Sequence, residues 1–372
     1  MTLNRNLSVF LDLLRLFAAL LVLIAHAGRI YQMHLPDLVA HSAKEGVVIF
    51  FALSGFVIAF VTTEKERDWR SFARARAVRM YSVVPLAIVV MAVCYFLGSP
   101  LAPHLYGLSD AASGGTFGQA PNAWGILRYL TFTNEIWFDR SVISTGAPFW
   151  SLGFEVAYYA GFAVLCYGRG YWRWGLVVGW AALCGPRILL AFPLWLVGVA
   201  AWSLVRRYAG RAPTGGWIGL GVVVLLTLIW RKAAGGVAVP LFEWPAPGAV
   251  LASMGYYLVL AVLTAALVVL FAACAPEHRI WPDGFERVVR YCAGASFTLY
   301  IAHLPVMVLI AAIWPGSMTY TVSGLAATAA TVIVMFGLAE FGERRKAAYA
   351  RIFDLSCEYL KGLCKFKVSA ID

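Results

Sequence analysis

The sequence predicts an all-α, polytopic membrane protein, and three observations support this prediction. Of the 372 residues, 61% are hydrophobic and only 13% are charged, and a soluble protein of this length could not bury so much apolar surface. The apolar residues form long runs, most of them long enough for a helix to cross a bilayer. Lysine and arginine are concentrated in alternate connections between these runs, as they are when basic loops face the cytoplasm.

The apolar runs predict about ten transmembrane helices. The fifth and sixth runs are short and nearly fused around Pro186, Arg187 and Pro193. An even number of crossings places both termini on one side of the membrane, and the basic connections assign that side to the cytoplasm. The predicted spans are residues 8–27, 46–62, 80–98, 148–167, 174–190, 191–205, 214–230, 249–273, 293–313 and 318–340.

The chain therefore divides into a transmembrane domain, residues 1–340, and a basic cytoplasmic tail, residues 341–372. Between Glu343 and Lys367 the apolar residues of the tail fall on one helical stripe and the opposite face is basic. This pattern is typical of an amphipathic helix that lies on a membrane surface, so we expect the tail to bind membrane lipids as an anchor.

The longest predicted outer connection, residues 99–147, is small and polar in its first half and aromatic in its second half. Two interpretations of the aromatic half stay open: an interfacial belt, or a platform on which a sugar stacks at the mouth of a cavity. The aromatic residues concerned are Trp124, Tyr129, Phe132, Trp137 and Phe138.

Three features suggest other classes of protein but do not establish them. The net charge of +11 does not indicate nucleic-acid binding, because excess basic residues in a membrane protein mark cytoplasmic loops. The seven cysteines are scattered without a CxxC pair, which predicts neither a disulfide framework nor a metal site. Ala25-His26-Ala27 matches a signal-peptidase pattern. Asp12 and Arg15 would be unusual just before a signal-peptide core, so we expect a retained transmembrane helix.

Arg15 and His26 are the most informative residues of the first span, because ionisable groups inside a transmembrane helix are costly and mark function by default. They are separated by ten apolar residues. In an α-helix this spacing brings both side chains to one face, within about 20° of each other and about 16 Å apart along the axis. A cation and an imidazole on one stripe suit a long ligand that lies along the helix.

The second span and the basic segment after it add two polar features. Ser54-Gly55 interrupts an apolar run, and alone it is best explained by close helix packing. Arg76 and Arg79 are three residues apart on one predicted helical face, at the cytoplasmic side. Arginine suits phosphate groups because its planar fork donates two hydrogen bonds, although positive-inside topology also explains the pair.

Two later spans carry polar stripes. In the fourth, Ser151, Glu155 and Tyr159 share a face with Tyr158, and Glu155 needs a partner inside the membrane. That partner is either an arginine or a histidine that the carboxylate orients. In the ninth, Ser296, Tyr300 and His303 lie on one face and Pro305 is expected to kink the helix. A single buried histidine is as readily a packing residue as a functional one.

Together these segments resemble the membrane-bound acyltransferase 3 family. Each motif is weak alone, whereas the ordered set from residue 11 to 305 is specific. One departure is that Met80-Tyr81-Ser82 follows the arginine pair where family members often have proline, and Pro85 comes later. This departure concerns where the next helix starts. The matching pieces are Arg15-x10-His26, Phe50-Phe51-x-x-Ser54-Gly55-Phe56, Arg76-x-x-Arg79, Trp150-Ser151-Leu152-x-x-Glu155-x-x-x-Tyr159 and Ser296-x-x-Leu299-Tyr300-x-x-His303-x-Pro305.

The resemblance implies an enzyme that transfers an acyl group, commonly acetyl, from cytoplasmic acyl-CoA to a hydroxyl of a cell-surface or membrane-associated carbohydrate. No bound cofactor or metal is implied, and the expected location is the bacterial inner membrane. Some members carry a soluble C-terminal hydrolase-like domain, which we do not expect here. The implied site residues are His26, Arg15 and Glu155 for catalysis, Arg76, Arg79, Ser54 and Gly55 for acyl-CoA, and Asp12, Ser151, Tyr159, Tyr300 and His303 in support.

The chemistry of these residues fits that activity. Arg76 and Arg79 can hold CoA phosphates, and a neutral His26 can take the proton of a sugar hydroxyl, or alternatively form an acyl-histidine. Two other classes stay open. Intramembrane Arg, His and Glu also suit a proton-coupled transporter, although no inverted repeat is visible. A lipid-linked sugar transferase could use the long outer connection, but no acidic cluster for its chemistry is apparent.

Overall fold

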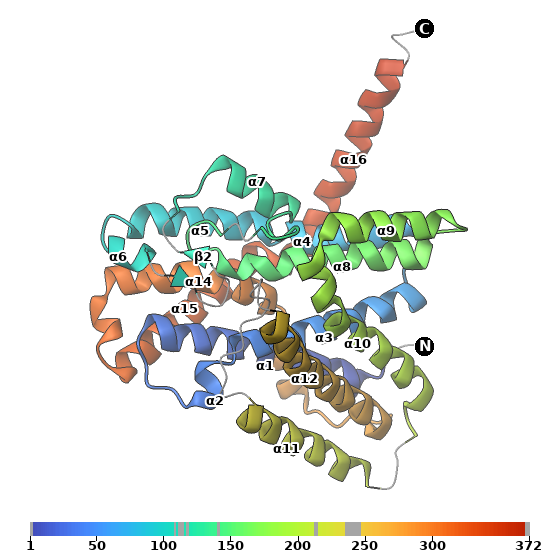
Figure 1. The fold of residues 1–372 in the computed structure, drawn as a ribbon, viewed down its shortest axis with the longest axis horizontal. Coiled ribbons are helices and arrows are strands. Elements are labelled where there is room, and N and C mark those ends of the chain that lie inside the picture. The colour runs from blue at the N-terminus through green and yellow to red at the C-terminus, as the bar shows by residue number, and fades with distance from the viewer. Residues whose placement is uncertain are drawn as a thin grey trace.

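The computed structural model describes residues 3–107, 109–110, 115–116, 119–139, 142–211, 215–234 and 247–368. Within these ranges nine helices are long and apolar enough to cross a membrane, which confirms an all-α polytopic fold. Most of them run roughly side by side along the long axis of the molecule (Figure 1). The strands in the described ranges are two residues each, β1 (Ser109–Asp110) and β2 (Gly115–Thr116), and pair antiparallel.

Nearly all of the regular structure in the described residues is helical. The first part of the chain contains α1 (Arg5–Ile30), α2 (Asp37–Ala40), α3 (Ala43–Glu64), α4 (Trp69–Tyr81), α5 (Val84–Gly98), α6 (Pro103–Tyr106), α7 (Ala123–Thr131) and η1 (Ala147–Phe149). The remainder contains α8 (Trp150–Tyr167), α9 (Trp172–Cys184), α10 (Pro186–Tyr208), α11 (Gly216–Ala234), α12 (Pro247–Cys274), α13 (Asp283–Ala293), α14 (Ser296–Ile313), η2 (Pro315–Met318), α15 (Thr321–Phe341), η3 (Glu343–Arg345) and α16 (Lys346–Val368).

Helix α9 accounts for the difference between nine long helices and the ten predicted spans. It has 13 residues, about 20 Å of helix, which is short for a bilayer core of about 30 Å. It nevertheless connects the two ends of the bundle. Before it, Tyr167 donates a hydrogen bond to Glu66 O in the α3–α4 connection, and at its far end the Trp137 amide bonds Cys184 O beside the outer connection. We therefore count α9 as the tenth crossing.

Two predicted boundaries are wrong by a few residues, and in each case local backbone chemistry explains the shift. The fifth and sixth spans separate at Gly185, not at residue 190, because Gly185 has φ +80° and packs against Trp137, where a Cβ would clash. Pro186 then starts α10 and Pro193 lies inside it. The third predicted span, 80–98, corresponds to α5, which starts only at Val84. The helix is interrupted at Ser82–Val83, and Pro85 occupies the first turn of α5.

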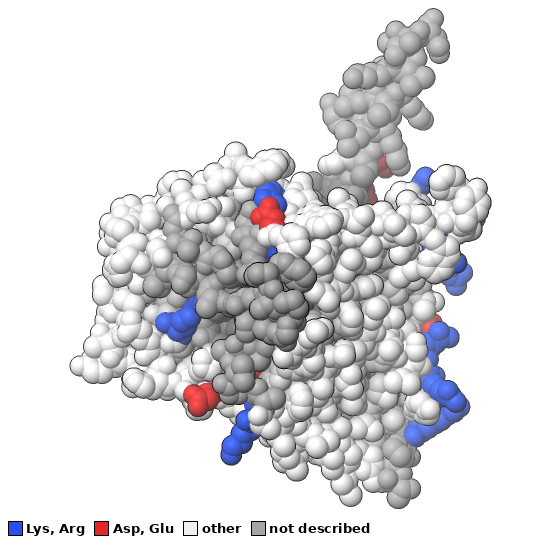
Figure 2. Space-filling view, in the orientation of Figure 1, with Lys and Arg blue, Asp and Glu red and all other residues white. Residues whose placement is uncertain are grey.

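Both ends of the helical chain lie at the same end of the bundle, as an even number of crossings requires. Asn6 at the start of α1 donates hydrogen bonds to Pro276 O and His278 O before α13, and Arg74 of α4 pairs with Asp354 of α16 at 2.6 Å. Lys and Arg gather along this edge of the molecule (Figure 2). The positive-inside rule assigns this end to the cytoplasm.

A charged cluster joins α1 to α13 at this end. Glu286 receives hydrogen bonds from Arg5 and Arg290 at 2.9 to 3.1 Å, and it also lies 3.3 Å from Arg279. These bonds from Arg5 and Arg290 hold the pKa of Glu286 at about 2, so the carboxylate stays ionised at neutral pH. The cluster fixes the start of α1, the helix that carries Arg15 and His26.

The tail forms the predicted helix, α16, which projects from the bundle (Figure 1). Ile352 of the predicted apolar stripe is exposed, as the apolar face of a surface helix must be in the absence of lipid. Leu360, Leu363 and Phe366, which complete the predicted stripe, lie beyond the described side chains. Membrane anchoring by the tail stays a prediction.

Helices α3 and α10 approach each other closely at two glycines. A Cβ at Gly55 would overlap Trp195 O, and a Cβ at Gly198 would overlap Ala52 O. Both obstacles are backbone atoms, which cannot move without separating the helices. Small residues serve this role in membrane-helix interfaces, so Gly55 fixes the position of α3 and therefore of its neighbour Ser54.

We expect Gly198→Ala to destabilise the protein by about 1–3 kcal/mol, because the added methyl group forces α3 and α10 apart. The measurement is the thermal unfolding midpoint in detergent. Gly179→Ala on α9 is the matched control, since a Cβ there meets open space. Equal midpoints for the two variants would show that this backbone contact does not limit stability.

Candidate active site

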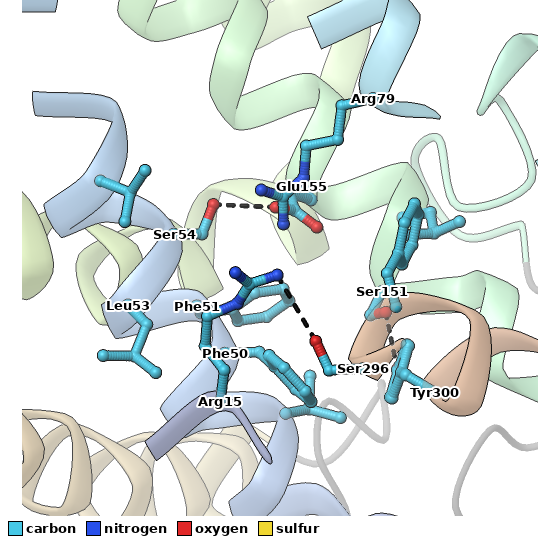
Figure 3. Close-up of a pocket in the computed structure, with 14 residues that line it drawn as sticks. Arg15, Phe50, Phe51, Leu53, Ser54, Arg79, Ser151, Glu155, Ser296 and Tyr300 are labelled. Carbon is cyan, nitrogen blue, oxygen red and sulfur yellow. Dashed lines mark hydrogen bonds between the residues drawn. The ribbon is translucent and has the colours of Figure 1, made fainter. Parts of the chain in front are cut away.

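Five helices converge on a cavity of about 70 Å³ inside the bundle. Figure 3 shows Arg15 rising from α1, Arg79 descending from α4, and Glu155 between them. All five sequence segments that carry the resemblance contribute residues to its wall, and the Arg-x-x-Arg pair contributes only its second arginine. The lining residues are Arg15, Val47, Phe50, Phe51, Leu53, Ser54, Val57, Arg79, Ser151, Leu152, Glu155, Ser296, Phe297 and Tyr300.

Glu155 is held by hydroxyl groups on one side of the cavity. The Ser54 hydroxyl donates to Glu155 Oε1 at 2.8 Å, and Tyr159, one turn later on α8, donates to the same oxygen. Trp195 Nε1 lies 3.2 Å from Ser54 Oγ and donates to it, which fixes that hydroxyl. The network connects α3, α8 and α10. The sequence left an arginine or a histidine as the partner of Glu155. The hydrogen bonds that Glu155 accepts come instead from the hydroxyls of Ser54 and Tyr159.

Two arginines present positive charge to the same cavity. Arg15 Nη2 donates to Ser296 Oγ at 3.5 Å, and Arg15 Nη1 lies 3.9 Å from Asp12 Oδ1. The Arg79 guanidinium lies over the Phe297 ring and reaches toward Glu155 (Figure 3). Two cations and one carboxylate leave the wall with an excess of positive charge, which favours an anionic ligand.

Glu343 supports the cavity, although the sequence analysis did not predict it as a site residue. Its Oε2 accepts hydrogen bonds from the backbone amides of Phe297 and Thr298, both at 3.0 Å, and the residue is 3% exposed. A carboxylate at the first turn of a helix satisfies amides that have no partner within the helix and opposes the helix dipole. Glu343 therefore holds the start of α14, where Ser296 and Phe297 face the cavity. A signal existed, namely an acidic residue directly after the last apolar run.

His26 lies farther along α1 and forms a pair with His303 of α14. The two ring nitrogens, His26 Nδ1 and His303 Nε2, are 2.9 Å apart. His303 is completely buried and His26 is 9% exposed. Arg15 and His26 thus both face α14, as the shared stripe on α1 predicts. Arg15 contacts Ser296, and His26 contacts His303, about two turns farther along α14.

Four further predicted residues lie beside the cavity or on its wall. Ser151 Oγ and the Tyr300 hydroxyl are 2.7 Å apart, which links α8 to α14, and Tyr159 supports Glu155. Asp12 lies between Arg15 and Arg290, at 3.2 Å from the latter, so it connects the cavity to the charged cluster at the start of α1. These contacts form three polar groups around the cavity, which link α8 to α14, hold Glu155 and place Asp12 beside Arg15.

Two residues predicted to bind acyl-CoA do not face the cavity. Arg76 pairs with Glu66 at 2.8 Å and lies over the Phe72 and Tyr159 rings, whereas Arg79 enters the cavity. The arginines separate because three residues on a helix differ in direction by about 60°. Gly55 faces α10, as described above. The direct role of Arg76 and of Gly55 toward a ligand stays a prediction.

The aromatic half of the outer connection divides into buried and exposed residues. Tyr129 is buried, stacks on Phe149 with ring centroids 4.3 Å apart, and donates a hydrogen bond to Gly146 O. Trp124, Trp137 and Phe138 are exposed. Tyr129 is thus a packing residue of the connection, and the exposed rings are those that could form either a belt or a sugar platform.

A buried ion pair that the sequence did not reveal fixes this connection. Glu135 Oε2 lies 2.9 Å from Arg187 Nη2, and both side chains are almost completely buried. Arg187 Nη1 also donates to Asp139 O at 2.7 Å. The start of α10 is therefore tied to the outer connection at two points.

The sequence matches a family described as "Acyltransferase domain" over residues 8–340. Comparisons with curated proteins and with solved structures found no match. The matched range contains every residue that lines the cavity, together with the His26–His303 pair. Because the match covers nearly the whole chain, the protein belongs to the membrane-bound acyltransferase 3 family and is an integral membrane acyltransferase.

Proposed function

We propose that the protein transfers an acyl group, with acetyl as the expected one, from cytoplasmic acyl-CoA to a hydroxyl of a carbohydrate. The acceptor is a polysaccharide, a lipid-linked sugar or a glycolipid, and the membrane is the bacterial inner membrane. The observation that carries the proposal is the pair of arginines, Arg15 of α1 and Arg79 of α4, in a cavity among membrane-spanning helices, where α1 also carries His26 of the buried His26–His303 pair.

The arginines support an acyl-CoA donor because its phosphates are anionic and arginine donates paired hydrogen bonds to phosphate. They lie toward the end of the bundle that the basic connections assign to the cytoplasm. His26 is eleven residues beyond Arg15 on α1, about 16 Å farther toward the outer side. A donor bound at the arginines could extend its thioester arm along α1 and α14 toward His26.

His26 would act as general base in the transfer. The acceptor hydroxyl attacks the thioester carbonyl carbon while the His26 imidazole takes the hydroxyl proton. The carbon–sulfur bond breaks, the acyl group becomes an ester of the acceptor, and the proton passes to the leaving CoA thiolate. The reaction balances without a metal or a redox partner. Glu155 would contribute negative charge near Arg79 rather than touch His26.

The test is CoA-dependent transfer by the purified protein in proteoliposomes. Radiolabelled acetyl-CoA is supplied to one side and a mixture of bacterial glycans to the other, and ester-linked label on the glycans is measured by mass spectrometry. Alkali-labile label on glycan supports the proposal. Labelled solute that crosses the membrane unmodified, with no ester formed, would support a transporter and contradict acyl transfer.

We expect the outer connection, residues 99–147, to select the acceptor. The donor approaches from the cytoplasmic end, so the acceptor should approach from the opposite end, where Trp124, Trp137 and Phe138 are exposed. Replacing the connection by that of a relative with another acceptor should change which glycan is modified and leave the KM for acyl-CoA unchanged. Continued modification of the original glycan would show that specificity lies within the helices. Because Glu135 pairs with Arg187, the exchanged segment must retain Glu135.

A further inference from the structure

The hydrogen bonds of His303 determine which of its nitrogens carries a proton. His303 Nδ1 lies 2.9 Å from both Leu299 O and Tyr300 O, the carbonyls of the preceding turn of α14. Carbonyl oxygens only accept hydrogen bonds, so Nδ1 must carry the proton. His303 is completely buried, and burial strongly disfavours an imidazolium. His303 is therefore neutral, and its Nε2 has a lone pair.

This lone pair determines the tautomer of His26. His26 Nδ1 is 2.9 Å from His303 Nε2, and one of the two nitrogens must donate. Because Nε2 of His303 has no proton, His26 Nδ1 carries the proton and donates it. A neutral His26 then has its lone pair on Nε2, since the bond made by one ring nitrogen decides the state of the other. The rings lie at 33° to each other with centroids 5.0 Å apart, so they meet nearly edge to edge and not as a stack.

We propose that His303 is a positioning residue that holds His26 in the tautomer whose Nε2 accepts the proton of the acceptor hydroxyl. The bond also serves the transition state. When Nε2 takes the proton, His26 becomes an imidazolium, and its Nδ1–H donates more strongly to the neutral Nε2 of His303. His303 keeps its own proton throughout, because its Nδ1–H donates hydrogen bonds to the α14 carbonyls. The role in catalysis rests on the proposed function, whereas the tautomer does not.

The first experiment reads the tautomer directly. The chain has six histidines, and ¹⁵N-histidine labelling of the full protein in detergent gives ring-nitrogen shifts that separate protonated from bare nitrogens. The signals lost in His26→Asn identify His26. We expect protonated Nδ1 and bare Nε2 in the wild type, and loss of this preference in His303→Leu. A wild-type His26 protonated at Nε2 would overturn the proposal, whether or not the protein transfers acyl groups.

The second experiment separates positioning from packing with two variants of similar size. His303→Gln places an amide oxygen near the former Nε2 and can still accept from His26. His303→Asn keeps a polar group near the former Nδ1 but is too short to reach His26. We expect His303→Asn to lower kcat about 10- to 100-fold with little change in KM for acyl-CoA, the size expected for a lost hydrogen bond to a charged group. His303→Gln should recover most of kcat. Equal losses in both variants would overturn the positioning role.

The two experiments fail in different ways. If the tautomer is as proposed but the wild type shows no CoA-dependent transfer, the proposed function is wrong and the His26–His303 arrangement stands. If transfer occurs but His26 has the other tautomer, the proposed function stands and the assignment to His303 is wrong.

Discussion

Replacing His26 by alanine is expected to reduce acyl transfer by about 10²–10⁴-fold while the protein still inserts and folds. This is the usual cost of removing a general base, and His26 is the imidazole that α1 carries beyond Arg15. The measurement is the initial rate of CoA-dependent transfer in proteoliposomes at matched protein content.

Two further variants make this prediction specific. His26→Asn can keep the hydrogen bond to His303 but lacks the second ring nitrogen, so it should be as inactive as the alanine variant and nearly as stable as the wild type. His34→Ala removes an exposed histidine of the outer side and should retain full activity. Near-normal transfer by well-folded His26→Asn would exclude His26 as the base.

Replacing Arg79 by alanine is expected to raise the KM for acyl-CoA about 10- to 100-fold, with a smaller effect on kcat. Arg79 is the arginine of the pair that enters the cavity, and a charged hydrogen bond to phosphate is worth about 1.5–3 kcal/mol. A loss of uniform binding raises KM more than it lowers kcat. Arg76→Ala should raise KM less, because Arg76 pairs with Glu66 outside the cavity.

The donor itself provides the control for Arg79. Acetyl-pantetheine carries the thioester but lacks the phosphates of CoA, so wild type and Arg79→Ala should use it equally well. If Arg79→Ala impairs both donors to the same extent, the arginine supports the fold of the cavity and does not bind phosphate. If the KM of Arg79→Ala for acyl-CoA equals that of the wild type, Arg76 and Arg79 serve only to set the topology of the chain in the membrane.

Much of the fold could be predicted from the sequence because the bilayer restricts the choices. A chain that crosses hydrocarbon must satisfy its backbone within each segment, so long apolar runs become helices. The positions of the runs therefore gave ten crossings, and the distribution of basic residues gave one end for both termini. The exact ends of α5 and α10 were misplaced because residues on both sides of Ser82 and Gly185 are similarly apolar, and local backbone geometry decided the break.

The candidate site was predictable where it depends on one helix at a time. Helical periodicity alone placed Arg15 and His26 on one stripe, and the structure shows that this stripe faces α14. Periodicity also grouped Arg76 with Arg79. In the structure, however, Arg76 contacts Glu66 and Tyr159 of α8, whereas Arg79 lies over Phe297 of α14. The direction of a side chain within a broad helical face depends on the neighbouring helices. The residue pattern of a single helix carries no information about those neighbours.

The sequence by itself determined the class of protein, the number of crossings, the family and most residues of the cavity. The tertiary structure alone decided which of those residues meet. His26 and His303 are 277 positions apart, Ser54 and Glu155 are 101 apart, and Glu343 caps a helix that begins 47 residues before it. The physical reason is that hydrogen bonds require particular donors and acceptors within about 3 Å, and that proximity is created by helix packing, through contacts such as those of Gly55 and Gly198.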